Sequence, residues 1–97
     1  MSKRFPATLL RMIRNQIPID DVITEMLRLD IRLTDKMLRF RCPLCGNFHT
    51  ATKLKTNLAR CFDCEKNFNP IDLVIEVTQC SFVEAVERLQ KGYNDRP

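Results

Sequence analysis

Residues 42–64 of the chain read CPLCGNFHTATKLKTNLARCFDC, which contains two C-x2-C pairs separated by residues 46–60. The pairs are Cys42 with Cys45 and Cys61 with Cys64. Two such pairs, each followed by a change of chain direction, can place four thiolates around one Zn²⁺, which accepts tetrahedral sulfur ligands without redox chemistry. The spacing therefore predicts a zinc ribbon with one structural zinc ion. Four sulfur ligands leave no open position for an activated water, so we do not expect the metal to be catalytic.

Disulfides, a redox couple and chance pairing are the alternative explanations of these cysteines. The N-terminal sequence MSKRFPATLL lacks the apolar core of a secretion signal, and no apolar run approaches the length of a membrane span. These features predict a cytoplasmic protein without membrane contact, where reducing conditions favour metal binding over disulfides. The fifth cysteine, Cys80, lies outside the spacing, and we interpret it as a small apolar core residue rather than a reactive thiol.

Helical periodicity is present on both sides of the cysteines. Apolar residues recur at helical spacing before and after Pro18, which predicts a helical segment over residues 5–30 with an interruption at the proline. Asn-Pro at 69–70 is a helix start signal, and Ser-Phe-Val-Glu at 81–84 is a capping-box pattern ahead of a last helix. Gly92 is expected to end that helix.

Between the helical parts, apolar and polar residues alternate over residues 37–41, 50–56 and 58–62, which predicts three short strands. In one antiparallel sheet these strands would have an apolar face, which includes Leu54, and a basic face. The basic face would carry Arg39, Arg41, Lys53 and Lys55. The predicted fold class is therefore α+β, a zinc ribbon with a small antiparallel sheet and a four-cysteine zinc site, flanked by N-terminal and C-terminal helices. We expect a single domain over residues 1–97, composed of a helical part (5–30), the zinc ribbon (37–66) and a helix pair (69–91).

The formal net charge is +4, from 16 basic and 12 acidic residues, and it is unevenly distributed. Residues 36–60 contain Lys and Arg but no Asp or Glu, whereas the flanking segments are acidic. A run of this kind is commonly a solvated surface. Clustered cations also bind phosphates with release of counterions, so a nucleic-acid face is the second interpretation. Phe48 could pack or stack on a base, and His49 could hydrogen-bond at the surface or contact nucleic acid.

Six stretches stand in order along the chain: FPATLLRMIR (5–14), IDDVITEMLRL (19–29), CPLC, CFDC, IDLVIEV (71–77) and SFVEAVERL (81–89). Together they resemble the N-terminal zinc-binding domain of bacterial DnaG-type DNA primases. The resemblance implies a zinc ribbon that handles single-stranded template DNA and helps to start a primer. The resemblance implies that Cys42, Cys45, Cys61 and Cys64 are the zinc ligands. It also implies that the nucleic-acid face is formed by Arg39, Arg41, Lys53, Lys55 and Arg60.

The chain also departs from the family pattern. Cys45 stands where the family usually has a histidine ligand, the loop between the pairs lacks the usual E-K-T-P-S-F stretch, and EKNFN (65–69) replaces a glycine-rich turn. Family primases continue into a catalytic core with an acidic metal site, which these 97 residues do not encode. The sequence has no carboxylate cluster, no nucleophile with a base and no phosphate-cradling glycine loop.

We therefore expect no enzyme activity of its own. The main hypothesis is a non-catalytic accessory subunit for DNA priming, which binds single-stranded DNA through the ribbon and a separately encoded polymerase, primase or helicase through its helices. Two alternatives use the same zinc. One is a small zinc-ribbon regulator of transcription that binds duplex DNA or RNA, and the other is a protein adaptor whose zinc only stabilises the fold.

Overall fold

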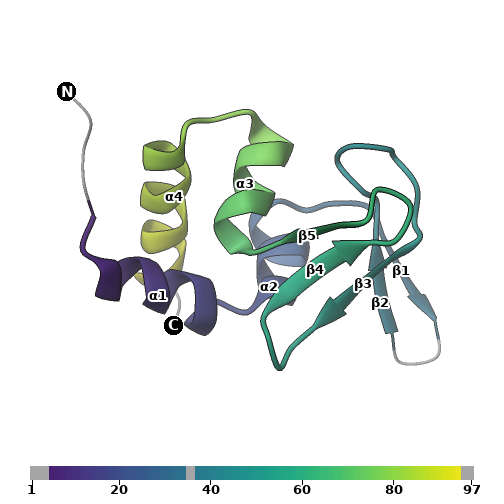
Figure 1. Ribbon diagram of the computed structural model, residues 1–97, viewed down its shortest axis with the longest axis horizontal. Helices are drawn as coiled ribbons and strands as arrows, with labels where there is room; N and C mark the ends of the chain where they lie inside the picture. Colours follow the sequence, from purple (N-terminus) through teal and green to yellow (C-terminus); the bar gives the residue numbers. More distant parts are fainter. Residues whose placement is uncertain (1–4, 35–36, 95–97) are drawn as a thin grey trace.

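A computed structural model describes residues 5–34 and 37–94 of the chain. N-terminal helices, two small antiparallel sheets and a C-terminal helix pair follow one another in sequence. The helices gather at one end of the molecule and the strands at the other (Figure 1). Within the described ranges, no helix is long and apolar enough to cross a membrane. The predicted α+β class is confirmed.

The N-terminal helices form on both sides of the proline break. Helix α1 (Ala7–Gln16) is followed by the short helix α2 (Ile19–Asp21), which continues directly into the π-helical turn η1 (Val22–Met26). The helical segment stops earlier than predicted because Arg28 has a φ of 50°, a left-handed conformation that a right-handed helix cannot accommodate.

The strands form two antiparallel sheets instead of the predicted single sheet. Strand β1 (Ile31–Thr34), which the sequence pattern did not predict, pairs with β2 (Met37–Phe40). The second sheet has the order β3-β4-β5, formed by β3 (Thr50–Lys53), β4 (Leu58–Cys61) and β5 (Lys66–Phe68). The basic residues that were predicted for one sheet therefore come from two sheets, because β2 and β3 belong to different sheets.

The predicted strand over residues 50–56 is too long. The chain turns over residues 54–57, so Lys55 lies in the turn instead of on a strand face. Leu54, which was expected on the apolar side, is 66 % exposed. Asn57 closes the turn with a φ of 55°, a left-handed conformation that asparagine tolerates better than most residues.

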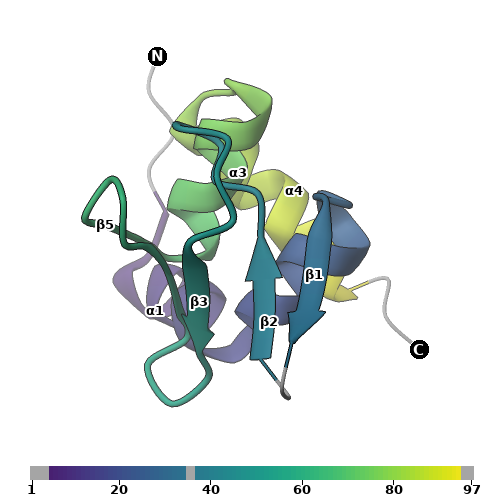
Figure 2. The same ribbon diagram turned by 90° about the vertical axis from the view of Figure 1, so that its right-hand side faces the viewer.

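A threonine side chain joins the two sheets. Thr50 Oγ1 accepts a hydrogen bond from the Phe40 N–H at 2.9 Å and donates one to the Phe40 carbonyl at 2.7 Å. The Arg39 guanidinium donates to the Thr50 carbonyl at 3.1 Å. Thr50 and Phe40 are buried, so these bonds satisfy backbone groups that water cannot reach. Strands β1, β2 and β3 consequently lie side by side, as Figure 2 shows.

The turn between β3 and β4 holds the N-terminal helices through the side chain of Asn57. Its Oδ1 accepts a hydrogen bond from the Ile19 N–H at 2.8 Å, and its Nδ2 donates to the carbonyls of Arg14 and Ile17, both at 2.7 Å. Asn57 is only 6 % exposed. The break between α1 and α2 leaves backbone groups without helical partners, and this one side chain supplies partners for three of them.

The predicted C-terminal helix pair is confirmed as α3 (Pro70–Thr78) and α4 (Phe82–Asn94). Asn69 caps α3 in a reciprocal capping box. Ser81 Oγ accepts a hydrogen bond from the Glu84 N–H at 3.1 Å, as the capping-box pattern predicted. The positions at which α3 and α4 begin are therefore determined by local sequence.

Gly92 does not end α4, contrary to the prediction, because the helix continues to Asn94. A Cβ atom at Gly92 would lie 2.9 Å from the Cε atom of Met26 in η1. The end of the Met26 side chain can move, so Gly92 marks a contact between α4 and η1 rather than the end of the helix.

The core lies between the helices and the inner faces of the sheets. Its buried helical members include Ile13, Ile19, Ile23, Leu73, Val74, Val86 and Leu89. Phe40 from β2 and Phe68 from β5 extend this core to the ribbon. Cys80 is half-buried and packs against the core, in agreement with its interpretation as an apolar residue.

Candidate metal centre and nucleic-acid face

Four cysteine thiols meet at the end of the ribbon. Cys42 follows β2 and Cys61 ends β4, so the two sheets bring the two buried thiols together. Cys45 and Cys64 come from the turns that follow, and Cys45 is exposed. The four Sγ atoms all lie within 4.8 Å of one another.

The spacing of these sulfur atoms fits a tetrahedral zinc ion. Zn–S bonds of about 2.3 Å in a tetrahedron require sulfur atoms about 3.8 Å apart. The Sγ atoms of Cys42 and Cys64 are 3.8 Å apart, and those of Cys45 and Cys61 are 3.6 Å apart. The four cysteines therefore bind one structural Zn²⁺, as the sequence predicted. The ion cross-links the two turns and contributes folding free energy.

Backbone hydrogen bonds prepare both turns for a thiolate. The Leu44 N–H donates to Cys42 Sγ and the Cys64 N–H donates to Cys61 Sγ, each at 3.4 Å. Gly46 closes the first turn with a φ of 78°, and its N–H donates to the Cys42 carbonyl at 2.9 Å. Because such N–H groups stabilise negative sulfur, the local geometry of the turns matches the charge of a zinc-bound ligand.

In the absence of a cation, the cluster favours a thiolate at Cys61 and opposes the ionisation of Cys42 and Cys64. Burial and the neighbouring thiols raise the pKa of Cys64 to about 12, and burial also raises the pKa of Cys42. Burial acts to raise the pKa of Cys61 as well, but the Cys64 N–H and the adjacent thiols more than offset it, so that pKa is lowered. Four thiolates can coexist here only around a cation, so zinc binding releases protons and weakens in acid.

The position that differs from the family pattern offers a direct test. Cys45→His is expected to retain one zinc per chain, because Cys45 is exposed and has room for an imidazole ring. Zinc accepts imidazole nitrogen at about 2.0–2.1 Å as readily as thiolate. Zinc content measures retention, and the visible spectrum of the cobalt-substituted protein should shift as one sulfur ligand is lost. Loss of the metal would show that the site requires four sulfurs.

The predicted nucleic-acid residues fall into two groups instead of one face. Arg39 lies on β2 and Arg41 directly follows it, with its guanidinium beside the Phe48 ring. Lys53 and Arg60 lie on the β3–β5 sheet, whereas Lys55 lies beyond β3 in the exposed turn.

The outer face of the β3–β5 sheet has a shallow hollow of about 480 Å³, which we call the ribbon face. It is lined by Ala51, Thr52, Lys53, Thr56, Leu58, Arg60, Phe62 and Asn67. Phe62 is 43 % exposed, and the Arg60 Cζ atom lies 5.7 Å from the centre of its ring. A partly exposed aromatic ring therefore lies beside the Arg60 guanidinium, in a hollow that Lys53 also lines. Phe62 was not among the predicted site residues, because its exposure depends on the turn after β4.

His49 connects the ribbon face to the second cysteine turn. Its Nδ1 lies 3.1 Å from Asp63 Oδ1, and its ring centre lies 5.1 Å from that of Phe62. The hydrogen bond from His49 lowers the pKa of Asp63, and Asn47 Nδ2 donates to the other carboxylate oxygen at 3.2 Å. His49 thus has the surface hydrogen-bonding role that we considered, outside the four-sulfur cluster.

The β1–β2 hairpin has a second concentration of cationic side chains, on the face away from the core. Arg32 lies opposite Arg39 in the strand register. The Cζ atoms of Arg32 and Arg41 lie 4.1 Å and 5.1 Å from the centre of the Phe48 ring. We call Arg32, Arg39 and Arg41 the hairpin face. Arg32 was missed because strand β1 was not predicted, although Ile-Arg-Leu-Thr does alternate.

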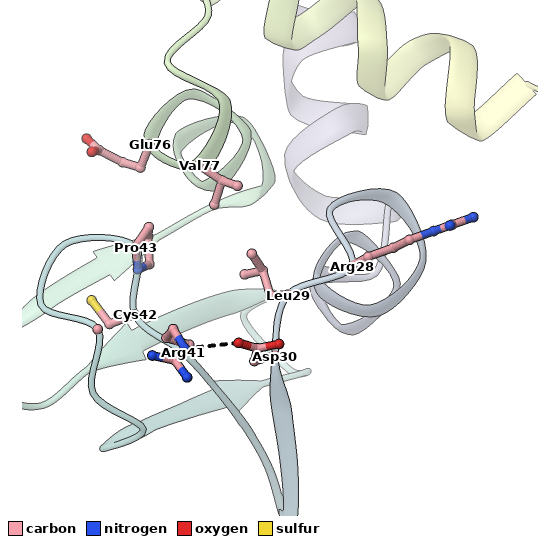
Figure 3. Close-up of a pocket in the computed structure, with 9 residues that line it drawn as sticks. Arg28, Leu29, Asp30, Arg41, Cys42, Pro43, Glu76 and Val77 are labelled. Atoms are coloured by element: carbon pink, nitrogen blue, oxygen red, sulfur yellow. Dashed lines mark hydrogen bonds and ion pairs between the residues drawn. The ribbon is translucent and has the colours of Figure 1, made fainter.

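A cleft of about 430 Å³ lies behind the first cysteine turn, between that turn, the chain after η1 and the end of α3. Asp30 Oδ2 and Arg41 Nε form an ion pair at 3.1 Å beside it, whereas Arg28 and Glu76 point away from this pair (Figure 3). The Arg41 N–H also donates to the Asp30 carbonyl at 3.0 Å. The cleft thus contains a link that closes the base of the β1–β2 hairpin, between the residue before β1 and the residue after β2.

Comparison with known families matches residues 5–96 to the CHC2 zinc finger, the zinc ribbon of DnaG. The chain belongs to the CHC2 zinc-finger family. This membership agrees with the resemblance carried by the six stretches and with the four-sulfur geometry, and it supports a zinc module that works with nucleic acid. A search of curated proteins finds no match. The CHC2 match extends over both helical parts, so it includes the helices as well as the metal turns.

Proposed function

We propose that this chain is a non-catalytic accessory subunit for DNA priming. It binds single-stranded template DNA on the ribbon face, and its helices bind a separately encoded polymerase, primase or helicase. CHC2 membership supports a role in replication. The closed four-sulfur site supports a metal that stabilises structure, so chemistry belongs to the partner and this chain contributes the positioning of template.

The ribbon face is the observation that carries this proposal. Lys53 and Arg60 supply cations for phosphates, and Phe62 supplies a partly exposed ring beside Arg60 in the same hollow. Cationic grooves with aromatic side chains are the usual platform for single strands, because every base has a flat face that can stack on a ring. A shallow sheet surface suits this binding better than duplex readout, which usually needs an element that enters a groove.

The test is binding of the zinc-loaded protein to a fluorescent oligothymidylate and to a duplex of equal length. We expect tighter binding of the single strand. The double variant Lys53→Gln/Arg60→Gln should reduce the slope of log K against log salt by about 1.4, since each phosphate contact on a single strand contributes about 0.7. The matched control Arg11→Gln/Arg88→Gln removes the same charge from exposed positions in α1 and α4 and should leave the slope unchanged.

Other results would favour the alternatives. A sequence-specific duplex site would favour the transcription regulator, and unchanged function after neutralisation of the basic residues would favour the adaptor. The partner role is tested by primer synthesis with and without this protein. Equal synthesis, together with no complex on gel filtration, would contradict it.

A further inference from the structure

The hairpin face holds like charges in an arrangement that is unfavourable by itself. Arg32 and Arg39 are direct cross-strand partners, so their side chains emerge on the same face. Like charges directly opposite each other destabilise an antiparallel pair. Among the described residues, the ion pair made by this face joins Arg41 to Asp30, and both members are exposed. An anionic ligand would remove the repulsion between Arg32 and Arg39.

The Phe48 ring holds two of these guanidinium groups in place. The Cζ atoms of Arg32 and Arg41 both lie within the distance of about 6 Å at which a cation is attracted to an aromatic ring. Phe48 itself is half-buried in the loop before β3. Two guanidinium groups already lie against this half-buried ring, which disfavours the base-stacking role considered for Phe48.

The arginines keep hydrogen-bond donors available in this arrangement. Each guanidinium has five N–H groups. Arg39 donates from Nη1 to the Thr50 carbonyl, and Arg41 donates from Nε to Asp30. An arginine that stacks through its flat face still presents its in-plane N–H groups at the edge, and this fork matches the geometry of a phosphate.

We infer that the hairpin face is a phosphodiester-binding surface, in which Arg32, Arg39 and Arg41 contact phosphates and Phe48 is a positioning residue for Arg32 and Arg41. The inference rests on the proposed binding of single-stranded DNA. It adds Arg32 to the site and separates two tasks. The hairpin face binds the backbone, and the Phe62 ring on the ribbon face, which is 43 % exposed, is left for bases.

Two probes of equal length distinguish these tasks, namely an oligothymidylate and an abasic oligonucleotide with the same phosphates. Arg32→Gln is expected to weaken binding of both and to reduce the salt slope by about 0.7, whereas Arg88→Gln in α4 changes neither. Phe48→Leu should weaken the binding of both oligonucleotides by the same factor, about two- to fivefold. Phe48→Tyr, which keeps an aromatic ring, should retain wild-type affinity. Zinc content and thermal unfolding verify that each variant is folded.

Three results would overturn the inference. If Phe48→Leu weakens only the thymidylate complex, Phe48 stacks on a base. If Arg32→Gln behaves like Arg88→Gln while Lys53→Gln/Arg60→Gln weakens binding, the hairpin face does not bind phosphate, and the proposed function remains supported. If the zinc-loaded wild-type protein binds neither probe, the proposed function and the inference both fail.

Discussion

Cys61→Ser is expected to abolish stoichiometric zinc binding and to unfold the ribbon. Its thiol is fully buried within the four-sulfur cluster, where a serine hydroxyl cannot replace a thiolate ligand. Structural zinc contributes about 10–16 kcal/mol of apparent binding free energy, as much as or more than the roughly 5–15 kcal/mol that stabilises a typical domain. Metal analysis measures the zinc content, and circular dichroism during heating measures the loss of structure.

The fifth cysteine provides a matched control. Cys80 packs against the core outside the cluster, so Cys80→Ser should retain one zinc per chain and lose only about 1 kcal/mol of stability. Chelation of the wild-type protein should reproduce the effect of Cys61→Ser. A Cys61→Ser protein with one bound zinc and an unchanged unfolding temperature would show that the cluster does not hold the metal.

Asn57→Asp is expected to lower the free energy of unfolding by about 3 kcal/mol or more, although it changes one atom of the side chain. The wild-type Nδ2 donates to the carbonyls of Arg14 and Ile17 at 2.7 Å. A carboxylate oxygen in its place would be a buried negative atom against two carbonyl oxygens, which loses both hydrogen bonds and adds repulsion. Urea unfolding of the zinc-loaded protein measures the change.

Asn67→Asp is the control for this substitution. Asn67 is exposed on β5, and its Oδ1 accepts a hydrogen bond from Arg60 at 3.3 Å, which a carboxylate can also accept. The free energy of unfolding of the Asn67→Asp protein should remain within about 0.5 kcal/mol of the wild-type value. Equal effects of the two substitutions would mean that the Asn57 bonds do not connect the ribbon to the helices.

Local sequence signals predicted the parts of the fold that depend on short-range chemistry. The C-x2-C pairs identified the metal cluster because ligand chemistry and spacing strongly restrict what such pairs can do. Asn69 and Ser81 identified the starts of α3 and α4 because an N-cap acts on residues three positions away.

The remaining features depend on contacts that sequence patterns do not reveal. The division into two sheets rests on Thr50, whose hydroxyl takes the place of a backbone ladder to Phe40. β5 has only three residues and is defined by its pairing with β4. Gly92 carried a helix-end signal, but it lies within α4 beside the Met26 side chain. Arg32 became a candidate site residue only once its strand register was known.

The Asn57 contacts also set an order of events during synthesis. They join residues 38 to 43 positions apart, so the N-terminal helices have no ribbon turn to dock on until Asn57 has emerged. Closing so long a loop slows folding. The second cysteine pair emerges later still, so metal capture and helix docking both wait for residues 57–64. The N-terminal helices are synthesised before the ribbon, but they are fixed in place only after the ribbon has been synthesised.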